Sequence, residues 1–113
     1  MKNKKTITEI AEASKEAPVV VVISASWCGP CRAFAPIFAE VANDSNLAEI
    51  YTLVKIDVDE CHDLCVEYEV DSVPCTFVFK GGVPVKRRSG TFPNAKLFME
   101  WIAEQILEQA IFI

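Results

Sequence analysis

The most constraining feature of this sequence is a Cys-x-x-Cys pair placed where a strand gives way to a helix. Residues 19–23 are an unbroken run of valine and isoleucine, as in a strand that is buried on both faces. Residues 27–31 read Trp-Cys-Gly-Pro-Cys. Apolar side chains then recur at the spacing of one helix face, at Cys31, Phe34, Ala35, Phe38, Val41 and Ala42. The pattern predicts a strand that feeds a helix carrying both thiols in its first turn.

This placement of the two thiols predicts redox chemistry. Residues three apart on a helix share a face, so Cys28 and Cys31 can form a disulfide with little backbone movement. The unpaired N–H groups of the first turn and the helix dipole favour a thiolate at Cys28, and the thiolate is the nucleophile. Pro30 is tolerated because a first-turn N–H has no intrahelical acceptor. Two packing cysteines, or half of a metal site, are the alternatives, and the flanking Trp, Gly and Pro argue against both.

Composition narrows the class of protein. The 113 residues are 51% apolar, so we expect a single domain over residues 1–113 with its own core. The net charge of −5 argues against nucleic acid as a partner. The odd number of cysteines fits a reducing compartment. No apolar segment follows the basic residues 1–5, and the longest apolar run is too short to cross a bilayer. We therefore expect a soluble cytoplasmic protein that is not bound to a membrane.

The rest of the chain alternates between helix and strand signals. Pro18 ends the first expected helix, and Pro36 should kink the second. Gly81 and Gly82 form a two-residue hairpin signal, so the strands on either side should be antiparallel, and Pro84 suits an edge strand. Residues 110–113 are apolar and either extend the last helix or dock elsewhere. The expected order is helix 6–16, strand 19–23, helix 28–43, strand 51–58, helix 60–68, strand 76–79, edge strand 83–88 and a helix from 93 onward.

Residues 27–31, set between a core strand and a helix, resemble the active-site signature of the thioredoxin family, and the similarity covers nearly the whole chain. It implies an α/β thioredoxin fold, a central mixed sheet with helices on both faces. Only residues 2–5 are left for the family's first strand, which should be very short or absent. The resemblance also implies that Cys28 attacks a substrate disulfide and that Cys31 then attacks Cys28, leaving a redox-active Cys28–Cys31 disulfide.

The same resemblance implies a substrate-docking surface around the two cysteines. Val73 and Pro74 lie between the third helix and a hairpin, where the family has a cis-proline turn. In the family, the backbone of the residue before this proline pairs with an extended substrate. Gly90 can equally be an ordinary glycine at the end of a strand. The candidate substrate-binding residues are Trp27, Gly29, Pro30, Val73, Pro74 and Gly90.

Two positions depart from the family pattern. The family usually has a buried Asp six residues before the first cysteine, which is thought to shuttle a proton for the resolving thiol, and Val22 stands there instead. We expect exchange to survive with an altered pH dependence. Lys55, where the family often has a lysine, either favours the thiolate or is solvated. Cys75, directly after Pro74, is either a thiol open to modification or a small apolar residue at the start of a strand.

A second pair of cysteines stands four residues apart in the third expected helix. Cys61 and Cys65 share an apolar stripe with Leu64 and Tyr68. This favours two buried, unreactive thiols over a regulatory disulfide or a zinc site. The single histidine, His62, reads as an exposed helix residue, and we expect no metal.

The sequence therefore predicts a protein disulfide reductase of the thioredoxin family that contributes to redox homeostasis. The resemblance implies oxidised protein substrates, recycling by an NADPH-dependent thioredoxin reductase and no bound cofactor. We expect a monomer. One alternative is a net oxidant or isomerase, which the Gly-Pro between the cysteines and the absence of a signal sequence disfavour. The other is a binding module of the same fold with little turnover, which only Val22 favours.

Overall fold

The computed structural model describes residues 7–44 and 49–107, and these follow the expected order of helices and strands. Residues 2–5 and the apolar end at 110–113, on which we made predictions, lie outside the described residues. The elements are α1 (Ile7–Ala13), β1 (Val19–Ser24), α2 (Gly29–Ala42), β2 (Thr52–Asp57), the 3-10 helix η2 (Val58–Glu60), α3 (His62–Glu67), β3 (Cys75–Lys80), β4 (Val83–Ser89) and α4 (Ala95–Leu107).

The strands form one mixed sheet in the order β2-β1-β3-β4. β1 pairs in parallel with β2 and antiparallel with β3, so the two central strands are the most buried. The parallel pair with α2 between its strands is the predicted strand–helix–strand unit. The β1–β2 pairing ends with Ser24 opposite Asp57, at the end of the strands where the chain leaves β1 for α2.

The β3–β4 hairpin forms as predicted. Lys80 pairs with Val83 across a two-residue turn at Gly81 and Gly82. Both glycines have positive φ, 63° and 96°, which the twist of a two-residue hairpin favours and side chains disfavour. β4 is the edge strand and accommodates Pro84, which has no N–H to donate.

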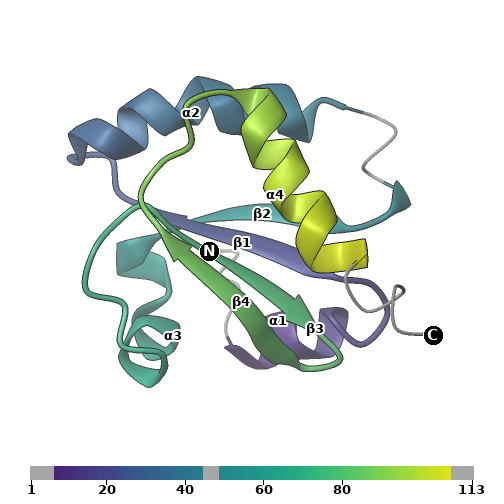
Figure 1. Ribbon diagram of the computed structural model, residues 1–113. Coiled ribbons are helices and arrows are strands. Elements are labelled where there is room, and N and C mark those ends of the chain that lie inside the picture. Colours follow the sequence, from purple (N-terminus) through teal and green to yellow (C-terminus); the bar gives the residue numbers. More distant parts are fainter. Residues whose placement is uncertain (1–6, 45–48, 108–113) are drawn as a thin grey trace.

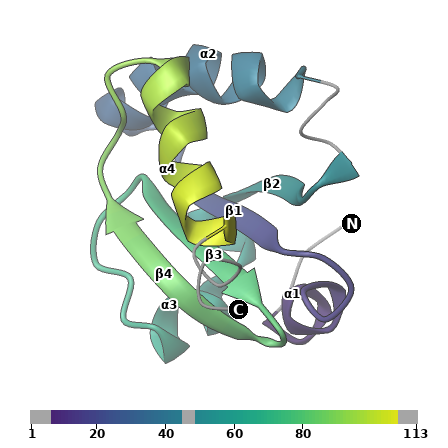
Figure 2. The same cartoon turned by 45° about the vertical axis from the view of Figure 1, so that its right-hand side comes forward.

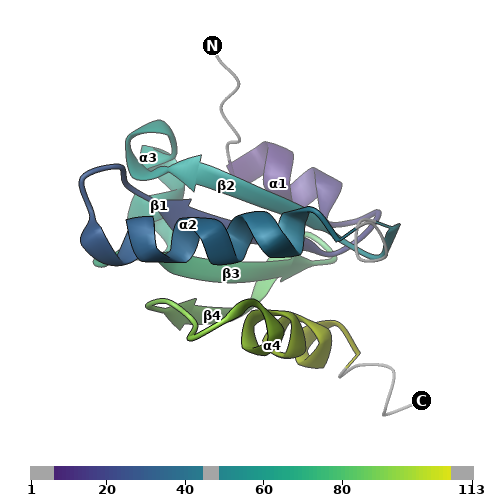
Figure 3. The same cartoon turned by 90° about the horizontal axis from the view of Figure 1, so that it is seen from above.

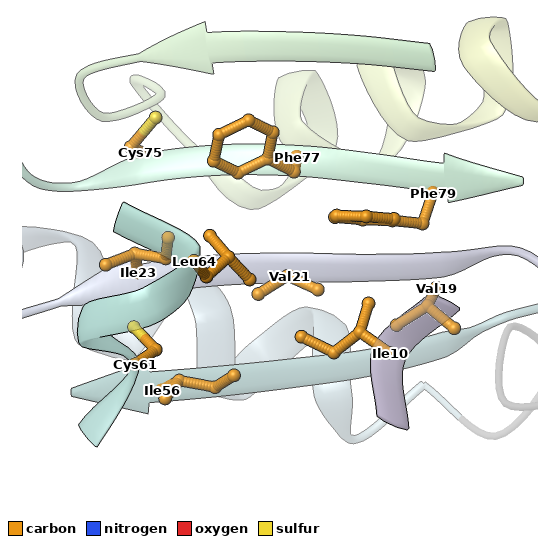
Figure 4. Close-up of a cluster of buried hydrophobic side chains, with 10 residues drawn as sticks. All are labelled: Ile10, Val19, Val21, Ile23, Ile56, Cys61, Leu64, Cys75, Phe77 and Phe79. Carbon is orange, nitrogen blue, oxygen red and sulfur yellow. The ribbon is translucent and has the colours of Figure 1, made fainter. Parts of the chain in front are cut away.

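Helices cover both faces of the sheet. α2 and α4 lie on one face, and α1 and α3 lie on the other (Figures 1 and 2). Viewed from above, α2 runs over the central strands and α4 lies along the side of β4 (Figure 3). The α2-face cluster consists of Val20, Val22, Phe34, Val41, Tyr51, Val78, Phe92, Ala95, Phe98 and Ile102. The α3-face cluster consists of Ile10, Val19, Val21, Ile23, Ile56, Cys61, Leu64, Cys75, Phe77 and Phe79 (Figure 4).

Aromatic rings fix α2 against α4. The Phe34 ring lies one turn beyond Cys31 and packs edge-on against Phe98, with 5.1 Å between centroids. Phe98 in turn stacks on Phe92 at 4.8 Å. Aromatic pairs contribute about 0.5–1.5 kcal/mol beyond the area they bury. These contacts therefore hold the first turns of α2, and the thiols there, in a defined position.

The basic run on β4, residues 86–88, lies along the exposed edge of the sheet, and its two arginines also contact aromatic rings. The Arg87 guanidinium lies 5.2 Å from the Phe77 ring centroid and donates to the backbone carbonyl groups of Tyr68 and Glu69. The Arg88 guanidinium lies 4.0 Å from the centroid of the Phe92 ring. Exposed guanidinium groups can cover nearby aromatic rings while they stay in contact with water, so these contacts agree with a solvated edge.

Candidate redox site

The two thiols lie where the chain leaves β1 and enters α2. Cys28 is the N-cap residue of α2, with an extended backbone at φ −95° and ψ 122°. Its sulfur accepts a hydrogen bond from the Cys31 N–H at 3.2 Å. The sulfur thus takes the place of the Ser or Asp oxygen in an ordinary cap and satisfies one otherwise unpaired N–H. Pro30 sits in the first turn, as predicted. Two adjacent thiols therefore share one helix end.

Burial opposes the thiolate that the helix end favours. Only 7% of Cys28 is exposed, and this burial, together with the side-chain hydrogen bond to Cys31, raises the pKa of the Cys28 thiol. The backbone N–H of Cys31 and the positive charge of Arg32 lower that pKa, but by less. The helix end therefore favours the thiolate as expected, while desolvation of the anion acts in the opposite direction and has the larger effect on the pKa of Cys28.

The turn before β3 contacts Cys28. The peptide bond between Val73 and Pro74 is cis, as the resemblance implies. The Cys28 thiol donates to the Val73 carbonyl oxygen at 3.5 Å. The Gly90 N–H donates to the Pro74 carbonyl oxygen at 2.8 Å, so Gly90 lies beside the turn. Gly90 has φ 91°, a conformation that side chains rarely adopt. The structure therefore brings Val73, Pro74 and Gly90 together next to Cys28.

The remaining predicted docking residues face solvent. Trp27 is 69% exposed, and Gly29 and Pro30 are also exposed. Val73 is half-buried and packs against the small cluster of Ala25, Cys28 and Cys31. Because Trp27 directly precedes the nearly buried Cys28 in the chain, its exposed indole offers an apolar surface close to that residue.

Val22 lies in the hydrophobic core, where the family has its acid. It is 1% exposed and belongs to the α2-face cluster. Its register partner, Lys55, is exposed, and the Lys55 ammonium lies 5.3 Å from the Phe38 ring centroid. This agrees with a snorkelling lysine whose stem covers an aromatic ring. The charge that remains near Val22 is therefore engaged with Phe38.

Sequence reasoning missed a pocket beside Cys31. The pocket is about 280 Å³ and is lined by Cys31, Arg32, Lys55 and Asp57, with small side chains from the loop after β1. Alternation along β2 is the signal that could have found it, because Lys55 and Asp57 share one face of the strand.

The other three cysteines belong to the α3-face cluster or pack against it. Cys75 is 0% exposed, and burial raises the pKa of its thiol, which supports its interpretation as a core residue. Burial, followed by the charge of Cys65, raises the pKa of Cys61 to about 12. The Cys61 and Cys65 sulfurs lie 3.8 Å apart as thiols, and Cys65 is half-buried. Within residues 7–44 and 49–107, no three potential ligands among His, Cys, Asp and Glu are grouped to hold a metal ion.

Comparisons with known proteins decide the family. The thioredoxin family model matches residues 2–104. The chain is 38% identical to a thioredoxin of Mycoplasmoides gallisepticum over 95 residues, which cover 84% of this chain and 90% of that protein. The chain belongs to the thioredoxin family. Thioredoxin C-2 of Corynebacterium nephridii is 39% identical over 82 residues, or 73% of this chain and 74% of that protein.

Solved structures agree with the thioredoxin fold. Thioredoxin of Fasciola hepatica superposes with a TM-score of 0.73 at 30% identity and covers 92% of this chain and 98% of its own. Thioredoxin of Malassezia sympodialis has the same TM-score at 24% identity, with 89% of this chain covered and 88% of its own, and supports the fold alone.

As a thioredoxin-family member, the chain is a thiol–disulfide oxidoreductase, as the resemblance implied. The predicted α/β fold, with a central mixed sheet and helices on both faces, is confirmed. The similarity to named thioredoxins does not favour the alternative of a binding module. Among the described residues, no helix is both long and apolar enough to span a membrane.

Proposed function

We propose that this chain reduces disulfides in oxidised proteins, with Cys28 as the attacking thiol and Cys31 as the resolving thiol. One observation carries the proposal: the two sulfur-bearing residues share the first turn of α2, where the Cys31 N–H already points at the Cys28 sulfur at 3.2 Å. That hydrogen bond favours negative charge on the sulfur as it reacts.

The reaction proceeds by two exchanges. The Cys28 thiolate attacks one sulfur of the substrate, the substrate S–S bond breaks, and the departing substrate thiolate takes a proton from water. Cys31 then loses its proton and its sulfur attacks the Cys28 sulfur. The bond from Cys28 to the substrate breaks, the second substrate thiolate leaves, and a Cys28–Cys31 disulfide remains. The substrate gains two electrons, and the pair loses two.

The docking surface supports a protein substrate. Trp27 offers an exposed apolar face, and Val73 offers its backbone next to the sulfur. An extended peptide that pairs with the Val73 backbone would lie across Cys28 and extend toward Gly90 and Trp27. Backbone pairing of this kind tolerates many substrate sequences.

Electrons to regenerate the dithiol would come from an NADPH-dependent thioredoxin reductase. A protein of Mycobacterium leprae named bifunctional thioredoxin reductase/thioredoxin is 38% identical over 87 residues, which cover 77% of this chain and 19% of that protein. The name of that relative joins a thioredoxin reductase and a thioredoxin in one protein, which supports a thioredoxin reductase as the partner of this chain.

We also propose that the protein is a monomer with a single domain over residues 1–113. It would act in the cytoplasm and contribute to electron transfer in redox homeostasis. The odd number of cysteines, five, means that they cannot all pair within the chain, and this supports a reducing compartment. Light scattering after size-exclusion chromatography tests the monomer.

Reduction of insulin by dithiothreitol tests the function. We expect the wild type to accelerate precipitation of the insulin B chain and Cys28→Ser to lose the acceleration. Cys75→Ser is the matched control, since it also removes a buried thiol next to the cis-proline turn, and it should keep the activity. A folded wild type without acceleration would contradict the proposal and leave a binding module.

A further inference from the structure

The resolving step leaves one proton without an assigned acceptor. In the proposed function, on which this inference rests, Cys31 must lose its proton before its sulfur attacks Cys28. Val22 occupies the place of the family's acid, is 1% exposed and has no ionisable group. A proton acceptor must therefore reach Cys31 from another direction.

The pocket beside Cys31 provides that direction. Its volume of about 280 Å³ has room for several water molecules, since each takes about 30 Å³ in the liquid. Its ionisable lining residues are Cys31 and Arg32 from α2 and Lys55 and Asp57 from β2. Among the lining residues of the described chain, Asp57 is the only carboxylate. Cys31 and this carboxylate therefore share one small volume that water can enter.

The alternation of side chains along β2 explains why Asp57 reaches this pocket. Leu53 packs against the α2-face cluster, and the Lys55 ammonium lies over the Phe38 ring of α2. Side chains two residues apart lie on the same face of a strand. Asp57 therefore follows Leu53 and Lys55 on the face covered by α2, the helix that carries Cys31.

The register also relates Asp57 to the missing acid. Val22 of β1 stands opposite Lys55, and Ser24 stands opposite Asp57. Compared with the family's acid on the central strand β1, the Asp57 carboxylate lies on the neighbouring strand β2. It also lies two residues nearer to the end of the strands where the chain leaves β1 for α2. Asp57 is half-buried, so its carboxylate can carry charge at a lower desolvation cost than an acid would pay at the fully buried position 22.

We propose that Asp57 accepts the Cys31 proton through water in this pocket. As the Cys31 sulfur attacks the Cys28 sulfur, its proton passes to a water molecule, which gives a proton to the Asp57 carboxylate. The bond from Cys28 to the substrate breaks and the substrate thiolate leaves. Asp57 then returns the proton to solvent through the same pocket.

Contacts around Asp57 hold the carboxylate in place. Its Oδ1 accepts the Asp59 N–H at 2.8 Å. Lys55 and Arg32 supply the positive charge that lines the pocket. From the α3 side, the Cys61 thiol donates to the Asp57 backbone carbonyl at 3.5 Å and not to the carboxylate.

A single-turnover reaction with a nitro-aromatic disulfide isolates the proton step. Cys28 releases the first coloured thiolate when it attacks, and Cys31 releases the second when it resolves. The coloured thiolate leaves without needing a proton, so the second phase reports deprotonation and attack by Cys31. Stopped-flow absorbance measures both phases over a range of pH, and Cys28→Ser gives the background from the other thiols.

Asp57→Asn is the decisive variant, because asparagine keeps the shape and can still accept the Asp59 N–H. We expect it to slow the second phase about tenfold or more near neutral pH and to leave the first within about twofold. Its second phase should also depend more steeply on pH than that of the wild type. Asp57→Glu should recover part of the rate.

Asp59→Asn is the matched control, since it removes the same charge two residues away at an exposed position outside the pocket lining. Both of its phases should match the wild type. If Asp57→Asn gives the same second phase and pH profile as Asp59→Asn, the assignment of Asp57 is overturned while the proposed function stands. If the wild type has no second phase that Cys31→Ser removes, the proposed function fails as well.

Discussion

Two helices of this molecule begin with a cysteine at the N-cap, yet they use it in opposite ways. At α2, the Cys28 sulfur accepts the Cys31 N–H at 3.2 Å and lies beside an exposed indole. At α3, the Cys61 sulfur instead donates to the Asp57 carbonyl at 3.5 Å and is 0% exposed. A cysteine at a helix start is therefore not sufficient for reactivity.

The charges around Cys28 and Cys61 also differ, in the direction that favours a thiolate at Cys28 over one at Cys61. Arg32 lowers the pKa of Cys28, although burial raises it overall. After burial and Cys65, the carboxylates of Asp63 and Asp57 raise the pKa of Cys61 further. Cys28 therefore differs from Cys61 in two respects: a backbone N–H points at its sulfur, and a cation instead of carboxylates acts on the pKa of its thiol.

Alkylation should show the largest difference between the two helix starts. With a pKa of about 12, roughly one Cys61 in 10⁴ is a thiolate at about pH 8 even before access is considered. We expect iodoacetamide to label Cys28 more than 100 times faster than Cys61, measured by peptide mass spectrometry over time. Equal rates in the folded protein would remove the contrast.

Truncation of Leu64 should show that the start of α3, where Cys61 lies, contributes to the stability of the fold. Leu64 is 0% exposed in the α3-face cluster, so Leu64→Ala should lower the free energy of unfolding by about 2–5 kcal/mol. Trp27→Ala removes a larger side chain that is 69% exposed and should cost less than about 0.5 kcal/mol. Urea denaturation measures both, and similar losses would show that Trp27 supports the fold.

Substitution of Gly90 should have a smaller effect. At φ 91°, a β-carbon strains the backbone, although no described atom lies within 4 Å of it. We expect Gly90→Ala to cost about 1–3 kcal/mol in unfolding free energy. Insulin reduction should fall too, because the Gly90 N–H braces the Pro74 carbonyl. Unchanged stability and activity would support the reading as an ordinary strand-end glycine.

Arg32→Gln should produce the smallest change. Loss of the cation raises the pKa of Cys28, so the thiolate fraction falls at any pH below that pKa. We expect alkylation of Cys28 to slow about two- to threefold near neutral pH and to converge with the wild type at high pH. Rates that differ equally at every pH would indicate a steric effect.

Much of this contrast could be predicted from sequence, since local signals carry it. The strand before residues 27–31, the apolar stripe of α2 and the glycines of the hairpin are each encoded within a few neighbouring residues. The α3 stripe likewise predicted the core position of Cys61. These elements follow from periodicity and turn chemistry, which need no knowledge of distant contacts.

The features that the sequence did not predict arise where distant segments meet. The burial that raises the pKa of Cys28 comes partly from Val73, which is 45 residues away. The contacts of Arg87 with Tyr68 and Glu69 join β4 to the turn after α3. The pocket shared by Cys31 and Asp57 depends on how α2 crosses β2. Such environments depend on tertiary packing and not on local pattern.

The most direct test is to trap the first intermediate in Cys31→Ser. Without the resolving thiol, an oxidised protein substrate should remain linked to the attacking cysteine, and digestion without reduction followed by mass spectrometry locates the link. We expect nearly all of the linked substrate to be on Cys28 and the double variant Cys28→Ser/Cys31→Ser to form no link. Linkage at Cys61 or Cys65, or no linkage by a folded protein, would contradict this expectation.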